Sequence, residues 1–320
     1  MTIALVGGSG LVGTALARQL QAQGDRVLIV DRVRPRVAVD NARVDLVATD
    51  AAAALTSVFR RFDVDKVVHL AARVDPPRDA ADREAMRVLH DAGTRAVVAA
   101  ARAVDVDRFV LVSSAVVYGA RAENAVPLEV EAPIAPSAFA YAEDKAAQER
   151  LVRSLVDDDV LSVVRPGIVC APWARNYLTE IIRRARLPVL GGVLPALDGH
   201  RPPLQFGHVD DVAAVLVAAI HAAQTGTFHA SSADWLAYDD VARAVGLHVV
   251  DVPTRFVGPV LDRLVPLLPS SWRAPSGLFP YLMHPFVTSM ASTSRRLGVL
   301  PQWTTMAALR AMVEGPATTT

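Results

Sequence analysis

Residues Thr2–Gly13, which read TIALVGGSGLVG, decide the fold. A strand-forming run leads directly into glycines spaced G-x-x-G-x-x-G, and a helical pattern follows. In such a strand–turn–helix unit Gly7 allows the tight turn, Gly10 lets the backbone approach a pyrophosphate, and Gly13 lets helix and strand pack closely. The helix N-terminus would meet the phosphate charge with free N–H groups and its dipole. The stretch therefore predicts a dinucleotide-binding unit.

Short apolar runs and longer helical patterns alternate through the first half of the chain. We expect buried strands at Ile3–Val6, Arg26–Val30, Val44–Leu46, Lys66–Leu70, Arg108–Val112 and Leu161–Val164. We expect helices at Leu11–Gln21, Asp50–Phe59, Arg83–Ala103 and Ala138–Val156. Strand–helix alternation of this kind is typical of a doubly wound parallel sheet. The predicted fold class is α/β, a Rossmann-type sheet with a smaller C-terminal α/β substrate lobe.

The pattern changes after about Arg165, where Pro and Gly become frequent. Helices are expected at Thr179–Arg186, Val209–Ala222, Tyr238–Val245 and Thr304–Val313. We therefore predict a Rossmann domain over residues 1–165 that carries the catalytic residues. Residues 166–320 would form mainly a substrate-binding lobe, with some segments returning to the first domain.

Composition narrows the class of protein. The 320 residues carry 33 basic and 33 acidic side chains, and no basic patch stands out, so nucleic acid is not an expected partner. The single cysteine, Cys170, excludes an internal disulfide framework and suits a reducing cytosol. The sequence opens without a signal-peptide pattern. The longest apolar stretch, Val212–Ile220, is shorter than the roughly 20 residues that a bilayer span takes. We expect a cytoplasmic protein without a membrane partner.

The end of the second predicted strand addresses cofactor choice. Asp31 can accept hydrogen bonds from both ribose hydroxyls of NAD and would repel a 2′-phosphate. Arg32 and Arg34 follow at once and could hold that phosphate instead. The carboxylate comes first in reach, which favours NAD and leaves NADP as the alternative. Asp45, with Leu46, ends the third predicted strand, where a carboxylate could reach the adenine amino group.

A second constellation carries the chemistry. Tyr141 and Lys145 stand one turn apart in a predicted helix, so their side chains share a face. The Lys145 ammonium would favour the Tyr141 phenolate, lowering a pKa of about 10 toward working pH. Lys145 can also donate to the nicotinamide ribose. Ser114, after the fifth predicted strand, can orient a substrate oxygen while Tyr141 removes or returns the hydroxyl proton. These residues predict hydride transfer at a secondary alcohol carbon.

With these motifs in place, the chain resembles an extended short-chain dehydrogenase/reductase of the NAD-dependent epimerase/dehydratase type, from Thr2 to about Val313. The resemblance includes four further segments, which are Val67–Ala72 (VVHLAA), Gly93-Thr94, Arg165–Val169 (RPGIV) and Gly207–Ala213 (GHVDDVA). It implies a Rossmann-type domain that holds NAD(P), with a small-molecule substrate in a cleft beneath the C-terminal lobe. It also implies a homodimer through a four-helix bundle built on about Arg83–Ala103 and Ala138–Val156.

Motifs and resemblance together assign the site, which contains no expected metal. The expected catalytic residues are Ser114, Tyr141 and Lys145. The expected cofactor contacts are Gly7, Gly10, Leu11, Val12, Gly13, Asp31, Arg32, Asp45, Leu46, Leu70, Ala71, Ala72, Tyr141, Lys145, Pro166 and Ile168. The expected substrate contacts are Arg73, Ser114, Ala115, Val116, Asn176 and Arg201.

Departures from the family pattern reduce the number of reactions that we expect of this chain. Relatives that eliminate water from nucleotide sugars carry an Asp-Glu pair where this chain has Ala115 and Val116, which disfavours a 4,6-dehydratase. The arginine that grips the diphosphate in nucleotide-sugar epimerases is replaced by Leu204. Arg201 or Arg175 could substitute, although neither is in register, and the loss lowers the expectation of a nucleotide-diphosphate substrate.

Other departures concern the surroundings of the site. His90 replaces the asparagine of the N-x-x-G-T helix motif and is either a packed helix histidine that bonds to backbone or a titrating group near the cleft. The chain has Cys170-Ala171-Pro172 where relatives often have Tyr-Gly-Pro. The apolar, aromatic stretch Arg255–Met290 suits a substrate lid, and equally an ordinary packed lobe or a dimer face. Asp210 or Asp211 is expected to cap a helix rather than bind a metal.

Three functions remain open at this point. The first is an NAD-dependent oxidoreductase or epimerase that acts on a sugar or nucleotide sugar. The second is a dehydrogenase or ketoreductase of an apolar alcohol or ketone, steroid-like or polyketide-like. The third is a non-enzymatic dinucleotide-binding protein, which the intact Ser114, Tyr141 and Lys145 disfavour.

Overall fold

The computed structural model describes residues 1–74, 77, 79–172, 174, 177–186, 191–255 and 276–314. At its centre lies a seven-stranded parallel sheet with the order β10-β6-β5-β4-β1-β2-β3. The strands are β1 (Thr2–Val6), β2 (Arg26–Asp31), β3 (Asp40–Arg43), β4 (Val64–His69), β5 (Arg108–Val112), β6 (Leu161–Pro166) and β10 (Gly226–Ala230). The chain reverses its order between β1 and β4, where ligands bind in open α/β sheets. The expected Rossmann-type fold is confirmed.

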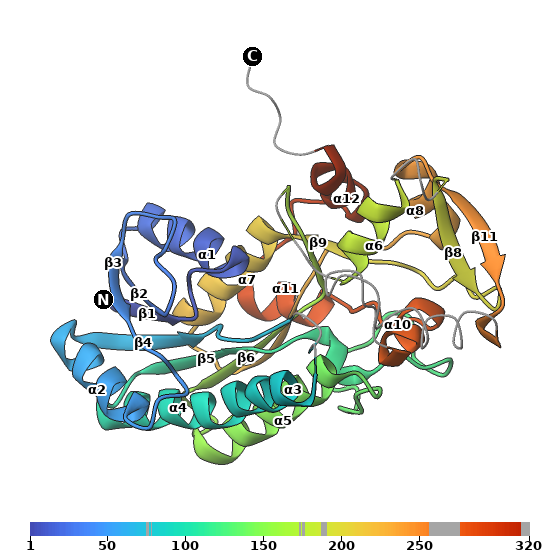
Figure 1. Ribbon diagram of the computed structural model, residues 1–320. Coiled ribbons are helices and arrows are strands. Elements are labelled where there is room, and N and C mark those ends of the chain that lie inside the picture. Colours follow the sequence, from blue (N-terminus) through green and yellow to red (C-terminus); the bar gives the residue numbers. More distant parts are fainter. Residues whose placement is uncertain are drawn as a thin grey trace.

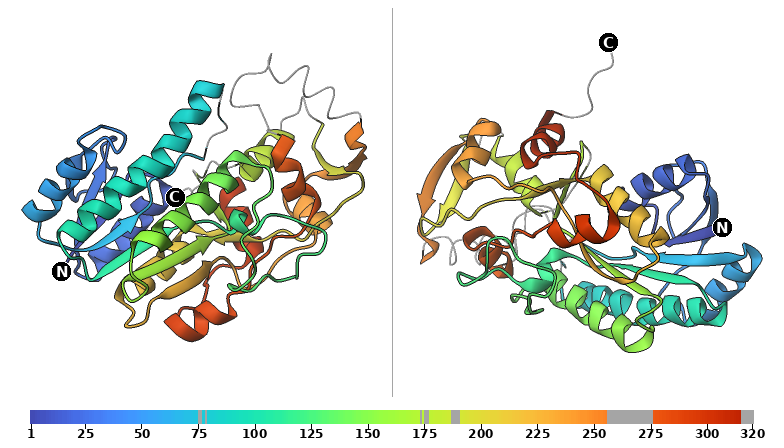
Figure 2. Two further views of the ribbon diagram at one scale, coloured as in Figure 1. Left: turned by 90° about the horizontal axis from the view of Figure 1, so that it is seen from below. Right: turned by 180° about the vertical axis from the view of Figure 1, so that it is seen from behind.

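Helices cover both faces of the sheet (Figure 1). One face carries α2 (Ala51–Arg61), α3 (Ala80–Val88), α4 (Thr94–Ala103) and α5 (Ala140–Leu155). A π-helical turn, η1 (Leu89–Gly93), joins α3 to α4, so the predicted single helix is one run with an irregular centre. The view from below shows α4 and α5 side by side (Figure 2). A homodimer built on these helices stays a prediction.

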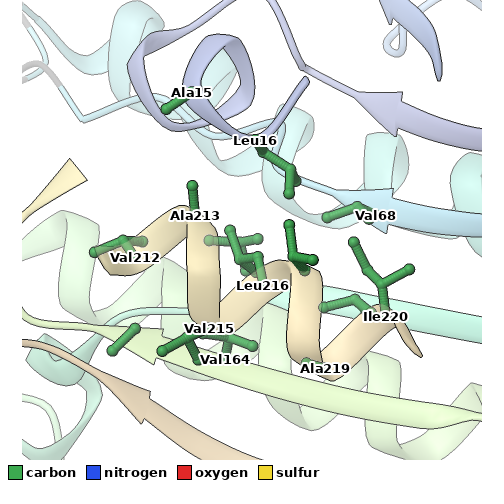
Figure 3. Packing of buried hydrophobic residues seen from close by; sticks show 14 of the residues in the cluster. Ala15, Leu16, Val68, Val164, Val212, Ala213, Val215, Leu216, Ala219 and Ile220 are labelled. Carbon is green, nitrogen blue, oxygen red and sulfur yellow. The ribbon is translucent and has the colours of Figure 1, made fainter. Parts of the chain in front are cut away.

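The opposite face is covered by α1 (Leu11–Ala22) and α7 (Val209–His221). Figure 3 shows Leu216 and Ala213 of α7 directed toward Leu16 and Ala15 of α1, while Val215 lies over Val164 of the sheet. Because α7 lies beside α1 and over β5, β6 and β10, its apolar side chains are buried nearly all round. The chain therefore returns to the Rossmann layers after residue 166 and supplies a helix and a seventh strand.

The smaller lobe has its own core. Its paired strands are β8 (Val193–Leu197) with β11 (His248–Val252) and β7 (Ile168–Cys170) with β9 (Phe206–His208). Its helices are α6 (Tyr177–Ala185), α8 (Tyr238–Ala244) and α12 (Thr305–Glu314). Cys170 and Phe206 are both fully buried in this core, so the cysteine packs as a small hydrophobic residue. Two further helices, α10 (Phe279–Met283) and α11 (Ala291–Leu297), follow in the C-terminal region. The division at residues 165 and 166 stays a prediction.

Two local expectations were wrong. The third strand covers Asp40–Arg43, not Val44–Leu46, because this edge strand is polar and largely exposed, while the apolar residues after it turn inward. The cap of α7 is His208, whose Nδ1 accepts from the backbone N–H of Asp210 at 3.3 Å. Asp211 instead accepts from the backbone N–H groups of Gln302 and Trp303, each at 2.9 Å, and so ties the C-terminal segment to α7.

Among the helices of the described residues, none has the length and apolar character that a membrane crossing requires.

Candidate active site

A cavity of about 940 Å³ opens at the carboxyl ends of the central strands, at the point where the strand order reverses. Its lining begins at the glycine turn after β1 and continues along the ends of β2, β4, β5 and β6 to α5 and α10. All of the predicted cofactor residues line it, and so do the predicted catalytic residues Ser114, Tyr141 and Lys145. The structure therefore brings residues from 7 to 168 into one continuous pocket.

The glycine turn has the geometry that a dinucleotide pyrophosphate requires. Gly7 has a φ of +80°, and a Cβ there would lie 2.4 Å from the Ala71 backbone. A Cβ at Gly13 would lie 2.3 Å from the carbonyl oxygen of Gly8, so only glycine lets α1 start this close to the turn. Gly10 is the N-cap of α1, and a Cβ there would meet open space. The cradle therefore leaves room for a phosphate group beside the helix N-terminus.

Two glycine variants should separate packing from ligand binding. Gly13→Ala forces the carbonyl of Gly8 to move and should lower the free energy of unfolding by about 1–3 kcal/mol. Gly10→Ala meets no protein atom, so its stability should be unchanged while the affinity for NAD falls by about tenfold or more. Urea unfolding and calorimetric titration measure the two effects. Unchanged NAD affinity in Gly10→Ala would contradict the assignment of the cradle.

Asp31 lies at the end of β2, where its carboxylate is fixed by the turn. Oδ2 accepts from the backbone N–H of Ser9 at 3.0 Å, and Oδ1 accepts from that of Val33 at 3.1 Å. These bonds hold the negative charge at the β2 end of the cavity. Arg32 also lines the cavity there, whereas Arg34 does not. Asp45 lines the same end, with Oδ1 accepting from the backbone N–H of Val47 at 3.2 Å.

The predicted catalytic residues come from two elements. Ser114 follows β5 and begins a short 3-10 helix, where its hydroxyl accepts from the backbone N–H of Val116 at 3.4 Å. Tyr141 lies in the first turn of α5, and Lys145 lies one turn further on. The rings of Phe139 and His90 contact the Tyr141 ring edge-on, with centroids 6.1 and 6.5 Å away.

The electrostatics of Tyr141 differ from expectation. Burial raises the pKa of Tyr141 to about 12, and a hydrogen bond with the Ser114 side chain acts in the opposite direction. The expectation that Lys145 lowers the pKa of Tyr141 was therefore wrong. The Lys145 ammonium instead donates to the carbonyl oxygen of Val112 at 2.8 Å and to Oε1 of Gln148 at 2.9 Å. Burial lowers the pKa of Lys145 to about 7, and the Glu149 carboxylate opposes this effect.

His90 is a packed histidine that bonds to backbone. Its Nε2 accepts from the backbone N–H of Arg73 at 3.0 Å, which fixes the loop after β4 at the cavity wall. Burial, and then the charge of Lys145, lowers the pKa of His90 to about 3, so the ring is neutral near pH 7. The alternative that His90 is a titrating group near the cleft was therefore wrong for pH values near 7.

The inner end of the cavity is largely apolar. Beyond Ser114 and Tyr141 it is lined by one charged residue, Arg73, and by Val74, Ala85, Leu89, Ala115, Val116, Phe139, Leu278, Tyr281, Leu282 and Phe286. Tyr281 of α10 donates to the carbonyl oxygen of Val116 at 2.7 Å, which ties the helix to the loop after Ser114. The aromatic stretch noted in the sequence thus contributes four lining residues, all between 278 and 286.

The predicted substrate residues Arg201, Arg73 and Asn176 have three different outcomes. Arg201 does not line the cavity and pairs with Asp251 at 2.7 Å in the smaller lobe, so the offset along the sequence misplaced it. Leu204, at the family's arginine position, is buried in the lobe core. Arg73 does line the cavity, and its guanidinium makes two bonds with the Asp82 carboxylate, at 2.6 and 2.7 Å. Asn176, Arg175 and residues 256–275 of the expected lid lie outside the described residues.

Sequence reasoning missed the polar layer beneath the site. Gln148 bonds to Lys145, and Thr94 bonds to both Gln148 and His69. No motif marks Gln148, although its place one turn after Lys145 on α5 could have indicated a contact. Among the described residues, no group of three or more His, Cys, Asp or Glu side chains is arranged to hold a metal ion.

Comparison with known proteins agrees with this geometry. A model of the NAD dependent epimerase/dehydratase family matches residues 3–232. The chain is 29% identical to a 3-diazoavenalumate denitrifying reductase from a Streptomyces species, over 92% of this chain and 91% of that protein. It is 27% identical to a 2-alkyl-3-oxoalkanoate reductase from Stenotrophomonas maltophilia, over 94% and 95% of the two chains.

A solved structure shows the same fold over nearly the whole chain. The UDP-glucose 4-epimerase of Thermus thermophilus, in complex with NAD, superposes with a TM-score of 0.73. The two sequences are 20% identical, and the match covers 98% of both chains.

Proposed function

Because the chain belongs to the NAD dependent epimerase/dehydratase family, we propose that it is an NAD-dependent reductase of a ketone with a largely apolar body. The observation that supports this most directly is the inner cavity, where apolar and aromatic side chains surround Ser114 and Tyr141. Both reductase relatives align with more than nine-tenths of this chain. The name of one describes a 2-alkyl-3-oxoalkanoate, an alkyl-substituted keto acid derivative.

The positions at which an arginine could recognise a nucleotide diphosphate hold either an apolar residue or an arginine that is paired with a carboxylate. Leu204 is buried, Arg201 pairs with Asp251, and Arg73 is held by Asp82. A diphosphate needs charge-assisted donors, since transfer of its charge from water is otherwise costly. Among the described residues of the inner cavity, Arg73 is the arginine available, and its charge is already balanced by Asp82. This arrangement favours an apolar substrate over a nucleotide sugar.

The catalytic roles follow from the geometry. NAD, when bound in its reduced form, supplies the hydride that the carbonyl carbon accepts. The Ser114 hydroxyl would donate to the carbonyl oxygen and orient it. Burial holds the Tyr141 phenol in its protonated form at neutral pH, so Tyr141 can give its proton to that oxygen. Lys145, anchored by Val112 and Gln148, would stabilise the negative charge that Tyr141 then carries.

The same residues bear on the other reactions of the family. Ala115 and Val116 carry no acid or base beside Ser114 that could protonate a leaving hydroxyl, which disfavours elimination of water. Asp31 at the ribose end favours NAD over NADP, because its fixed charge would repel a 2′-phosphate. Epimerisation of a nucleotide sugar is the second candidate, since it starts with the same hydride transfer.

A substrate panel distinguishes the two candidates. Aryl and long-chain alkyl ketones, tested with NADH by absorbance at about 340 nm, should be reduced, and UDP- and dTDP-sugars should not be epimerised. Phe286→Ala should raise KM for the apolar ketones by about tenfold or more, because the ring lines the inner cavity. Trp235→Ala is the matched control, since Trp235 is an exposed aromatic residue outside the cavity. Turnover of nucleotide sugars alone would overturn the proposal.

A further inference from the structure

The ammonium of Lys145 is anchored from below. Lys145 is buried, and its Nζ donates to the Val112 carbonyl oxygen at the end of β5 and to Gln148 Oε1 on α5. A lysine ammonium carries three N–H donors. Two are used by these acceptors, and one is left for the cavity, which Lys145 lines. The pose of the ammonium therefore depends on a backbone carbonyl, which is fixed, and on one side chain.

The Gln148 side chain is itself held in a single orientation. It is 1% exposed, and because an ammonium can only donate, the amide must present its oxygen to Lys145. The amide nitrogen then donates to Thr94 Oγ1 at 2.9 Å and lies 3.2 Å from Nε2 of His69. His69 Nε2 and Thr94 Oγ1 are 3.0 Å apart. Residues at β4, α4 and α5 together fix the amide.

We propose that Gln148 is a positioning residue for Lys145, fixing both the place and the charge of the ammonium beneath Tyr141. The functional part of this proposal rests on the role in ketone reduction assigned above to Lys145. The hydrogen-bonding part does not, because it concerns only Lys145 and its acceptor.

The other polar groups around Lys145 are either bonded to other residues or uncharged near pH 7. On α5, the Glu149 carboxylate favours the charged lysine, but Arg165 and Ser113 already bond to it. On β4 and η1, burial lowers the pKa of His69 and of His90 to about 3, so both are neutral near pH 7. Tyr141, on the first turn of α5, is protonated there. Among the described side chains, the amide oxygen of Gln148 is thus the acceptor that bonds directly to the Lys145 ammonium.

The chain is unusually suited to a direct test, because Lys66 and Lys145 are its only lysines. Lysine labelled with ¹³C at Cε gives one NMR signal per lysine, and each titrates with its own side chain. The full chain, free of cofactor, is compared with Gln148→Met and Gln148→Glu, which have similar volumes. Lys66, whose Nζ donates to the Ile220 carbonyl oxygen, serves as the reference in the same molecule. A Lys66→Arg variant assigns the signals.

The two variants should shift the titration of Lys145 in opposite directions. Gln148→Met removes an acceptor from a buried ammonium and should lower the pKa by about one unit or more. Gln148→Glu places a carboxylate there and should raise it by about one unit or more. The Lys66 signal should not move in either variant. Shifts in the same direction, or no shift, would overturn the proposal. If Gln148→Met does not fold, Gln148→Asn, whose amide falls short of the ammonium, takes its place with the same expected direction.

A kinetic readout separates this proposal from the proposed function. The charged lysine is lost as pH rises through its pKa, so Gln148→Met should move the alkaline limb of kcat to lower pH by the amount seen in the NMR titration. KM for the ketone should change little. An NMR shift without a kinetic shift would contradict the role of Lys145 in the reaction, while leaving its bond with Gln148 intact. A kinetic loss that is equal at every pH would contradict positioning by Gln148.

Discussion

Replacing Tyr141 by phenylalanine should lower kcat for ketone reduction by about three orders of magnitude while leaving the affinity for NADH within about twofold of wild type. The variant removes one hydroxyl and keeps the ring that packs against Phe139 and His90. Without that hydroxyl the site loses the phenolic proton that burial retains near neutral pH. Steady-state turnover and calorimetric titration of NADH measure the two quantities.

Tyr238→Phe is the matched control for Tyr141→Phe. Tyr238 is also a largely buried tyrosine, and its hydroxyl donates to the Pro195 carbonyl oxygen at 2.6 Å in the smaller lobe, away from the cavity. This variant loses a buried hydrogen bond but should keep its turnover. Activity of Tyr141→Phe close to that of wild type would mean that another group donates the proton, and the mechanism would be wrong.

The second large effect is expected in stability. Arg165 lies at the end of β6 with its side chain 4% exposed, and it donates to both carboxylate oxygens of Glu149, at 2.5 and 3.1 Å. The guanidinium also donates to the Tyr118 hydroxyl and the Val130 carbonyl oxygen. Arg165→Met should lower the free energy of unfolding by about 3–5 kcal/mol, because it leaves the buried Glu149 carboxylate without its main partner. Urea unfolding at pH 7 measures the loss.

Arg153→Met provides the control on the same carboxylate. Arg153 donates to Glu149 Oε1 at 2.9 Å, but its side chain is 36% exposed, and its loss leaves the bonds between Arg165 and Glu149 in place. We expect a loss of about 1 kcal/mol or less. Equal losses in the two variants would show that burial of Arg165 does not determine the strength of the pair.

The dependence on pH has a definite sign. Burial acts to raise the pKa of Glu149, but the hydrogen bonds and charge of Arg165 outweigh it and hold that pKa below the ordinary value. A lowered pKa in the folded state gives stability that is present above the unfolded pKa of about 4.3 and is lost as pH falls through the folded pKa. In Arg165→Met, Glu149 can relieve its burial by taking a proton. The stability difference between the variant and wild type should therefore shrink as pH falls toward about 4.3, where Glu149 of the variant takes its proton. It should shrink further below about 4.3, where the wild type loses the stability of the ionised pair.

The local patterns were sufficient to predict the glycine turn and five of the seven strands of the sheet, which are β1, β2, β4, β5 and β6. Each of these features depends on residues close together in sequence, such as Thr2–Gly13, or on spacing within one helix, such as Tyr141 and Lys145. The position of strand β3 was mispredicted because an edge strand needs only backbone pairing. Its polar residues Asp40–Arg43 lack the apolar pattern by which strands are recognised in a sequence. The cap of α7 was missed because Asp211 is used by Gln302 and Trp303 from the distant end of the chain.

Contacts between distant segments were beyond sequence reasoning. Arg201 was expected at the substrate from its offset along the chain, but its partner Asp251 belongs to a strand whose pairing no motif indicates. The layer of His69, Thr94 and Gln148 combines three elements that only the folded sheet brings together. For the same reason, the raised pKa of Tyr141 could not be predicted, because it follows from burial that the surrounding elements create.

The most direct test of the central claim follows a deuterium label from cofactor to product. NADH carrying deuterium at the nicotinamide C4 is supplied with an aryl or alkyl ketone, and the carbinol carbon of the alcohol product is examined for the label. The account predicts that mass spectrometry finds deuterium in the product formed by the wild-type chain, with Tyr238→Phe equal to wild type and Tyr141→Phe nearly inactive. Failure to bind NADH, or a labelled product formed equally fast by Tyr141→Phe, would contradict hydride transfer at Ser114, Tyr141 and Lys145.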